Sequence, residues 1–189
     1  MPEAKKMRTF VALMRGINVG STRKVPMADL RALCAKAGLK RPQTYIQSGN
    51  LIVEAEGDAG EVRRQLEKVM TARFGFAIDI VVRAASEWER YVVANPFADD
   101  CDALAKMVHL YLSRDPLKSA AAKELNQMAQ SGERIELAAG ALWIDYGANG
   151  VGKSKLTPLL IDKACGSPTT GRNWNTVLKI REVIEARGH

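Results

Sequence analysis

The chain of 189 residues is long enough for one large domain or two small ones, and 47% of its residues are hydrophobic. With 26% charged residues, this composition excludes a disordered, collagen-like or coiled-coil chain. No apolar run approaches the ~20 residues that span a bilayer, and we expect neither a secretory signal nor a membrane partner. Cys34, Cys101 and Cys165 are too widely spaced for a disulfide framework or a zinc site. We therefore expect a cytoplasmic protein with no bound metal and no cofactor.

The net charge of +7 is distributed unevenly. Residues 1–50 carry ten Lys and Arg against two acids, a net +8, and residues 150–189 carry seven against three, a net +4. Residues 51–149 carry eleven against sixteen, a net −5. Basic ends around an acidic middle predict a positive surface patch if the two ends meet in the fold, although a solvated surface with excess lysine gives the same pattern.

The first part of the chain has the pattern of strand, helix, strand, strand, helix, strand. Short runs of apolar and β-branched residues that end at turn residues predict strands at 9–15, 44–47, 51–54 and 78–83. Pro26 opens the first helix, and Asp58 caps a second helix that ends at Gly75. Ser48-Gly49-Asn50 forms the turn of a hairpin between the middle strands.

The remainder of the chain repeats this order after a connecting helix, which we expect Ser86 and Glu89 to cap. Strands are predicted at 107–112, 134–138, 142–146 and 167–170, and helices from Asp115, over 154–163 and over 173–187. The predicted fold class is α+β, with two ferredoxin-like α/β plaits (βαββαβ repeated) and an extra C-terminal helix. The expected domains are residues 1–84 and 107–189, joined by a helix and linker at 85–106.

This topology brings polar loops together at the ends of the sheets. In the first plait, the loop after the first strand and the hairpin turn leave from the same end, about 10 Å apart. The residues that can share a site there are Arg15, Asn18, Lys24, Gln47 and Asn50. In the second plait, the expected cluster is Lys153, Ser154, Lys155, Arg172, Asn173 and Asn175. Such amide and cationic side chains suit a phosphate or a carboxylate, although Asn and Ser also form ordinary turns and caps.

Residues 147–154 satisfy the pattern G-x-x-x-x-G-K-S of the phosphate-binding P-loop, after a predicted strand and before a predicted helix. A P-loop enzyme also needs a parallel sheet and a later strand that ends in a magnesium-binding aspartate. Only 35 residues follow Ser154, and they offer no such strand. A weaker interpretation keeps this glycine-rich segment as a binder of some anion.

Six segments of the chain form a distinctive set: Arg15-Gly-Ile-Asn-Val-Gly20, Val25-Pro-Met27, Thr44-Tyr-Ile-Gln-Ser-Gly-Asn50, Asn95-Pro-Phe97, Ser154-Lys-Leu156 and Thr170-Gly-Arg-Asn-Trp-Asn-Thr-Val177. Together, over essentially the whole chain, they resemble the bacterial domain-of-unknown-function family 1697. The resemblance implies two ferredoxin-like domains and no established activity. Ser48 joins the candidate ligand-binding residues because it lies in one of these segments.

The sequence favours a module that binds a small anionic ligand at its basic loops. Nucleic-acid binding through the same cations is the alternative, although the scarcity of aromatic residues argues against base stacking. A nucleotide-using enzyme at Gly147–Ser154 is a third hypothesis, so the sequence leaves catalysis undecided and predicts no oligomeric state. Whether the two loop clusters line one basic cleft is a hypothesis that the sequence leaves open: the apolar residues of 9–15 alternate on both faces and predict a strand buried on both sides, which favours a second sheet against it.

Overall fold

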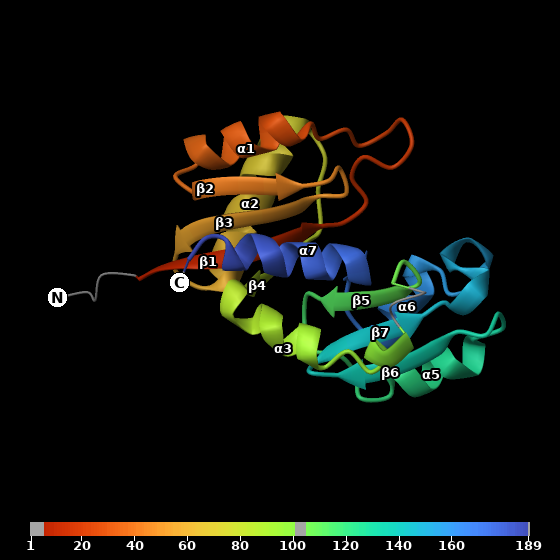
Figure 1. Cartoon of the computed structure of the whole chain (residues 1–189). Coiled ribbons are helices and arrows are strands. Elements are labelled where there is room, and N and C mark those ends of the chain that lie inside the picture. The colour runs from red at the N-terminus through yellow and green to blue at the C-terminus, as the bar shows by residue number, and fades with distance from the viewer. Residues whose placement is uncertain (1–5, 101–104, 189) are drawn as a thin grey trace. The chain divides into compact units, whose positions relative to one another are not determined.

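The computed structural model describes residues 6–100 and 105–188 (Figure 1), so Cys101 lies outside the described residues. The chain divides into two compact units. The first unit contains the residues up to 88 together with those from 182 onward, and the second contains residues 89–181. None of the helices in the described part combines the length and the apolar composition that crossing a bilayer requires.

The first unit contains one four-stranded antiparallel sheet and two helices (Figure 1). Its elements in chain order are β1 (Met7–Met14), α1 (Met27–Lys36), β2 (Lys40–Tyr45), β3 (Asn50–Glu56), α2 (Ala59–Phe74) and β4 (Ile80–Ala84). The strand order is β2-β3-β1-β4, so the first strand is central and pairs with β3 and β4. The six predicted elements of this unit are therefore found in the predicted order.

The second unit contains a sheet of the same strand order, β6-β7-β5-β8, also antiparallel throughout. Its elements are β5 (Val108–Ser113), α5 (Ala121–Met128), β6 (Arg134–Ala138), β7 (Ala141–Asp145), α6 (Pro158–Cys165) and β8 (Thr169–Asn173). Two further helices, α3 (Trp88–Val93) and α7 (Trp174–Glu185), each contain residues of both units. The predicted α+β class is confirmed.

Local capping explains where some helices begin and end. The Asp58 carboxylate accepts a hydrogen bond from Glu61 N–H at 2.8 Å, and the Glu61 carboxylate accepts one from Asp58 N–H at 2.9 Å. The predicted cap of α2 is confirmed by this reciprocal pair. The cap predicted from Ser86 and Glu89 is wrong, because the Glu87 carboxylate accepts from Ala84 N–H at 3.0 Å. A 3₁₀ turn, Ala85–Glu87, therefore precedes α3.

Three predicted boundaries in the second unit differ from those of the structure. The segment after Asp115 is not yet helical, since the Ser167 hydroxyl accepts from Asp115 N–H at 2.9 Å and donates to its carboxylate at 3.0 Å. Helix α6 begins four residues after Ser154, where the Thr157 hydroxyl accepts from Leu160 N–H at 3.3 Å. The last strand extends to Asn173 instead of ending near residue 170.

Both faces of β1 are buried, as the sequence predicts. Phe10, Ala12 and Met14 belong to the core that the sheet forms with α1 and α2. Val11 and Leu13, on the opposite face, are each 1% exposed. Strands buried on both faces read as continuous apolar runs, which is what residues 10–14 are.

The side chain of Arg187 closes a gap between two strands of the first sheet. Strand β2 has a bulge between Lys40 and Gln43, where Arg41 has a φ of 47°. Arg187 Nη2 donates to the carbonyl oxygens of Arg41 at 2.7 Å and of Ile52 at 3.1 Å. Because this side chain is only 5% exposed, its hydrogen bonds replace strand pairing that the bulge interrupts.

We expect Arg187→Ala to lower the free energy of unfolding of the first unit by about 2 kcal/mol or more, because it leaves the carbonyl oxygen of the buried Ile52, and that of Arg41, without their charged donor. Chemical denaturation followed by circular dichroism measures the change. Lys68→Ala, at an exposed position on α2, is the matched control and should change stability by less than about 0.5 kcal/mol. Equal effects of the two substitutions would contradict a structural role for Arg187.

Candidate functional site

The loop after β1 is closed by the side chain of Asn18. Its Nδ2 donates to the carbonyl oxygens of Val25 at 2.9 Å and of Gln47 at 2.8 Å, and its Oδ1 accepts from Val25 N–H at 2.8 Å. The structure therefore brings Asn18 and Gln47 together, and it joins the β1–α1 loop to the β2–β3 hairpin. We call the region formed by residues 15–25, 46–50 and 75–79 the loop end of the first unit.

The segment before β4 belongs to the same region. Arg23 Nη2 donates to the carbonyl oxygen of Ala77 at 2.7 Å, and its guanidinium carbon lies 4.9 Å from the centre of the Phe76 ring. Arg15 N–H donates to the carbonyl oxygen of Asp79 at 3.0 Å. The three segments are thus connected by hydrogen bonds, and the cations Arg15, Arg23 and Lys24 lie within them.

The other predicted residues of this cluster have internal partners. Lys24 is exposed, and its ammonium donates to the carbonyl oxygen of Gly20 at 2.6 Å. Asn50 is fully buried, and its Nδ2 donates to the Tyr45 carbonyl oxygen and to the Ser48 hydroxyl, both at 3.0 Å. Asn18 and Asn50 therefore shape the loops from within, while Lys24 presents its charge to solvent.

The hairpin turn requires glycine at position 49. Gly49 has a φ of 82°, and a Cβ atom added there would lie 2.7 Å from Met14 Cβ and 2.8 Å from Ile17 Cδ1. Its carbonyl oxygen accepts from Met14 N–H at 2.9 Å. The absence of a side chain therefore lets the hairpin lie directly against β1 and the loop that follows it.

In the second unit, the predicted cluster is divided between the two edges of the sheet. The Ser154 hydroxyl donates to the carboxylate of Glu133, the residue just before β6. Arg172 lies within β8, opposite Leu110. Because β6 and β8 are the two edge strands, the structure does not bring Ser154 and Arg172 together. Lys153 and Lys155 flank Ser154 and are exposed.

The remaining predicted residues of the second cluster surround the junction of β8 and α7. Arg172 is 8% exposed, and its Nη1 donates to the Thr170 hydroxyl at 2.9 Å and to the Gly171 carbonyl oxygen at 2.8 Å. Burial lowers the pKa of Arg172 to about 10. Asn173 caps α7, accepting from Thr176 N–H at 3.0 Å, and Asn175 is exposed on the first turn.

The P-loop pattern does not have the geometry of a phosphate-binding loop. Gly147–Asn149 and Val151–Lys153 form two 3₁₀ turns, and Ser154 is extended with a ψ of 141°. No helix begins at Lys153-Ser154, so no helix N-terminus points at a phosphate there. The antiparallel sheet also lacks the parallel strands of a P-loop fold among its described residues. These features argue against a nucleotide-hydrolysing enzyme at this segment.

A cluster of aromatic and polar side chains in the second unit was missed by the sequence reasoning. The hydroxyls of Tyr111 and Tyr146 are 2.7 Å apart, and the His109 ring lies edge-on to Tyr146 with centroids 5.2 Å apart. Burial is the main cause that lowers the pKa of His109, and nearby Arg172 lowers it further. Gly171 leaves room for the Tyr111 ring. The spacing of His109 and Tyr111, two residues apart on a strand, was the available signal.

Neither cysteine in the described residues is suited to nucleophilic or metal chemistry. Burial raises the pKa of the Cys34 thiol to about 12 and that of Cys165 to about 11. Within residues 6–100 and 105–188, no group of three or more His, Cys, Asp or Glu is placed to hold a metal ion.

Residues 7–143 match the model of a family described as protein of unknown function (DUF1697). The chain belongs to this family. Its structure is similar to that of the conserved bacterial protein SP0830 from Streptococcus pneumoniae, with a TM-score of 0.73 at 22% identity over 95% of this chain and 99% of that chain. An unknown protein from Galdieria sulphuraria gives a TM-score of 0.28 at 11% identity, over 97% and 94% of the two chains. No curated protein matches the chain.

We expect Gly49→Ala to destabilise the first unit by about 2 kcal/mol or more, because both the positive φ and the contact with Met14 oppose a Cβ atom. Gly16→Ala is the matched control, since Gly16 also has a positive φ but no atom lies within 4 Å of its added Cβ. Its cost should be about 1 kcal/mol, from backbone strain alone. Thermal unfolding of both variants tests the close contact between the hairpin turn and Met14. Equal melting temperatures of the two variants would contradict it.

We expect the second unit to lose stability as the pH falls below the ordinary histidine value of 6.5, in part through His109. Because its folded-state pKa is lowered, the unfolded chain takes up the proton first, and stability declines by up to about 1.4 kcal/mol per pH unit. The measurement is the difference in unfolding free energy between the native protein and His109→Gln from pH 7.5 to 5.5. Parallel pH profiles would show that His109 does not titrate differently on folding.

Proposed function

We propose that this protein binds a small anionic ligand, phosphate- or carboxylate-bearing, at the loop end of the first unit. The observation that carries the proposal is the concentration of strained backbone at this place. Of the five non-glycine residues with positive φ in the described chain, three lie here: Asn18, Arg23 and Ile46. Such conformations cost about 1–3 kcal/mol each and are found preferentially at ligand sites.

Ile46 supports this interpretation most directly. A β-branched residue is rarely found at positive φ, and Ile46 has a φ of 49°. Its side chain is 49% exposed, so burial does not offset the strain. Val19, in the neighbouring loop, is 68% exposed. The hydrogen bonds of Asn18, together with those of Arg23 and of the Arg15 N–H, therefore connect the segments of the loop end beneath these exposed residues.

The charge of the loop end fits an anion. Its segments contain three cations, Arg15, Arg23 and Lys24, and a single carboxylate, that of Asp79. Lys24 is exposed and Arg15 is partly exposed, so we take these two cations as the ones that contact the ligand, while the guanidinium of Arg23 lies against Phe76 and Ala77. Ser21 and Thr22 add two exposed hydroxyls to the same loop. Charge-assisted hydrogen bonds from such groups are the usual means of holding a phosphate or a carboxylate.

We expect sodium phosphate or ATP to raise the melting temperature of the protein at constant ionic strength. A ligand at ten times its Kd adds about 1.4 kcal/mol, which corresponds to a rise of roughly 3–6 °C for a chain of this size. Arg15→Gln with Lys24→Gln should abolish the rise, because the ligand loses both cations. Lys163→Gln, an exposed cation on α6, removes the same kind of charge elsewhere and should leave the rise unchanged.

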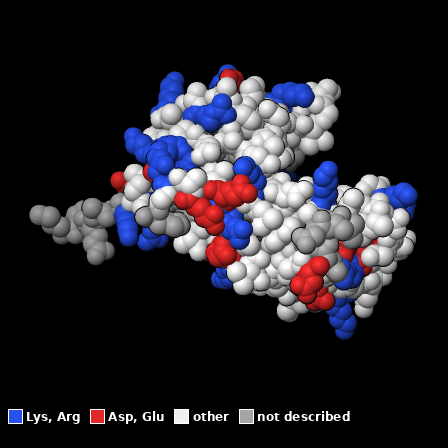
Figure 2. All heavy atoms as spheres, in the orientation of Figure 1, with Lys and Arg blue, Asp and Glu red and all other residues white. Residues whose placement is uncertain are grey.

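Two outcomes would contradict the proposal. One is the absence of stabilisation by phosphate, ATP and acetate at millimolar concentration. The other is an equal rise in the double variant and the native protein. Binding of a single-stranded oligonucleotide without any response to phosphate, with affinity that falls steeply with salt, would assign the cations to nucleic acid instead. On the face shown in Figure 2, Lys and Arg over the first unit are separated by uncharged surface, unlike a continuous basic stripe.

We also infer that each unit is a ferredoxin-like plait. Two features support this assignment: the order strand, helix, strand, strand, helix, strand in each unit, and the strand order in which the first strand lies between the third and the fourth. A domain limit near residue 84, a linker over 85–106 and one basic cleft shared by the loop clusters stay predictions. So does a cytoplasmic location, with which the unpaired Cys34 and Cys165 are compatible.

A further inference from the structure

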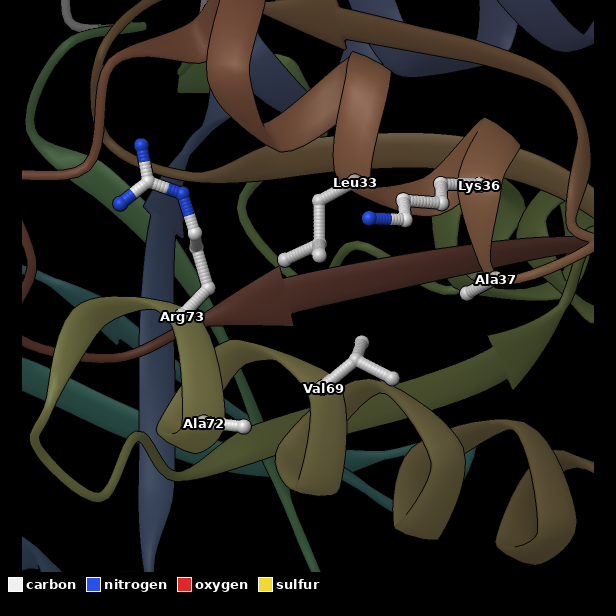
Figure 3. A pocket seen from close by; sticks show the side chains of 6 residues that line it. All are labelled: Leu33, Lys36, Ala37, Val69, Ala72 and Arg73. Atoms are coloured by element: carbon white, nitrogen blue, oxygen red, sulfur yellow. The ribbon is translucent and has the colours of Figure 1, made fainter.

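A pocket of about 350 Å³ lies between the two helices of the first unit (Figure 3), and none of its lining residues belongs to the loop end. Helix α1 contributes Leu33 and Lys36, with Ala37 directly after it, and helix α2 contributes Val69, Ala72 and Arg73. Pockets that hold small ligands have volumes from about 300 to 1,000 Å³. The pocket is therefore large enough for a ligand of a few carbon atoms.

Small residues leave the two helices incompletely packed, and this opens the pocket. The side chains at its floor are apolar. Leu33 and Val69 are partly buried and pack against the core of the first unit. Ala37 and Ala72 carry only a methyl group, so neither fills the space between the helices. Figure 3 shows the side chains of Leu33 and Val69 pointing into this space from opposite helices. The surface that remains uncovered is made of carbon and favours an alkyl group.

Two cations border this apolar surface, and they differ in their partners. Arg73 Nη2 lies 3.2 Å from the Asp29 carboxylate, so its charge is already balanced. Within the described part of the chain, no carboxylate lies within 4 Å of the Lys36 ammonium. Its side chain extends along α1 toward Leu33, which places the ammonium beside the apolar floor (Figure 3).

We propose that this pocket binds an amphiphilic carboxylate, with its alkyl chain on Leu33, Val69 and Ala72 and its carboxylate at Lys36. The proposal rests on the combination of an apolar floor with one cation that no carboxylate balances. A neutral alcohol lacks the charge that Lys36 complements, and an alkylamine is repelled by it. This site is independent of the anion site proposed at the loop end, since the two share no residue.

The test is a titration of the whole chain with octanoate, followed by the backbone amide signals of the ¹H–¹⁵N spectrum. We expect saturable shifts confined to α1, α2 and the residues after them. Lys36→Gln should weaken octanoate binding about three- to fivefold, the effect of removing one exposed ion pair, and Lys36→Arg should restore it. Lys68→Gln removes an exposed cation of α2 that does not line the pocket and is the matched control. Ala72→Phe should fill the pocket and abolish binding, with the spectrum itself reporting whether the variant is folded.

Several results would overturn the proposal. If octanol or octylamine bound as tightly as octanoate, the charge of Lys36 would not determine which ligand the pocket binds. Shifts at α1 and α2 that depend on protein concentration without octanoate would identify the groove as a contact between two copies of the chain. Octanoate shifts at the loop end, lost in the Arg15→Gln and Lys24→Gln variant, would place carboxylate binding there and leave the pocket empty. The proposal is supported if the shifts are confined to the residues around the pocket and are reduced by the substitutions at Lys36 and Ala72 but not by the one at Lys68.

Discussion

The side-chain amide of Asn18 determines the form of the loop end on which the candidate site depends. Its Nδ2 group donates to the carbonyl oxygens of Val25 and Gln47, which lie in two separate segments, and its Oδ1 accepts from the N–H group of Val25. Asn tolerates positive φ better than other non-glycine residues because its short amide can bond locally. Because the amide fixes the loop from inside, exposed residues such as Val19 and Ile46 are held in place without packing of their own. A ligand that binds as proposed would therefore meet a geometry that is already set, which reduces the entropy cost of binding.

Elements whose limits are set by near neighbours in the sequence were predicted well. The Asp58 and Glu61 pair and the glycine stop after α2 act within one turn of a helix, so their signals are contiguous in the sequence. Two other predictions failed because a distant residue decided the outcome. Ser167 delays the start of α5 by holding Asp115, which lies 52 residues earlier. Glu133 engages the hydroxyl of Ser154 from 21 residues away. The spacing of apolar and polar residues along the sequence carries no signal of such distant partners.

The candidate site was predicted in part for the same reason. Strand order alone brings the loop of Asn18 to the hairpin of Gln47, so their proximity followed from topology. What each polar side chain does there did not follow, because an amide that binds a ligand and one that holds a loop are the same residue type. Asn50, Ser154 and Asn173 all proved to have partners within the protein. The pocket between α1 and α2 left no signal, since it results from two alanines that are ordinary helix residues.

The placement of Arg187 has a consequence for how the protein is made. Arg187 contacts a carbonyl 146 residues earlier, so the first unit is completed by a residue that is added after the whole second unit has been synthesised. Domains usually fold in the order of their synthesis. Here the bulged edge strand β2 can form its hydrogen bonds with the Arg187 guanidinium only after the whole second unit has been synthesised. A nascent chain stalled within residues 89–181 would therefore present that edge without its arginine, and such edges are sites at which strands of other chains can pair.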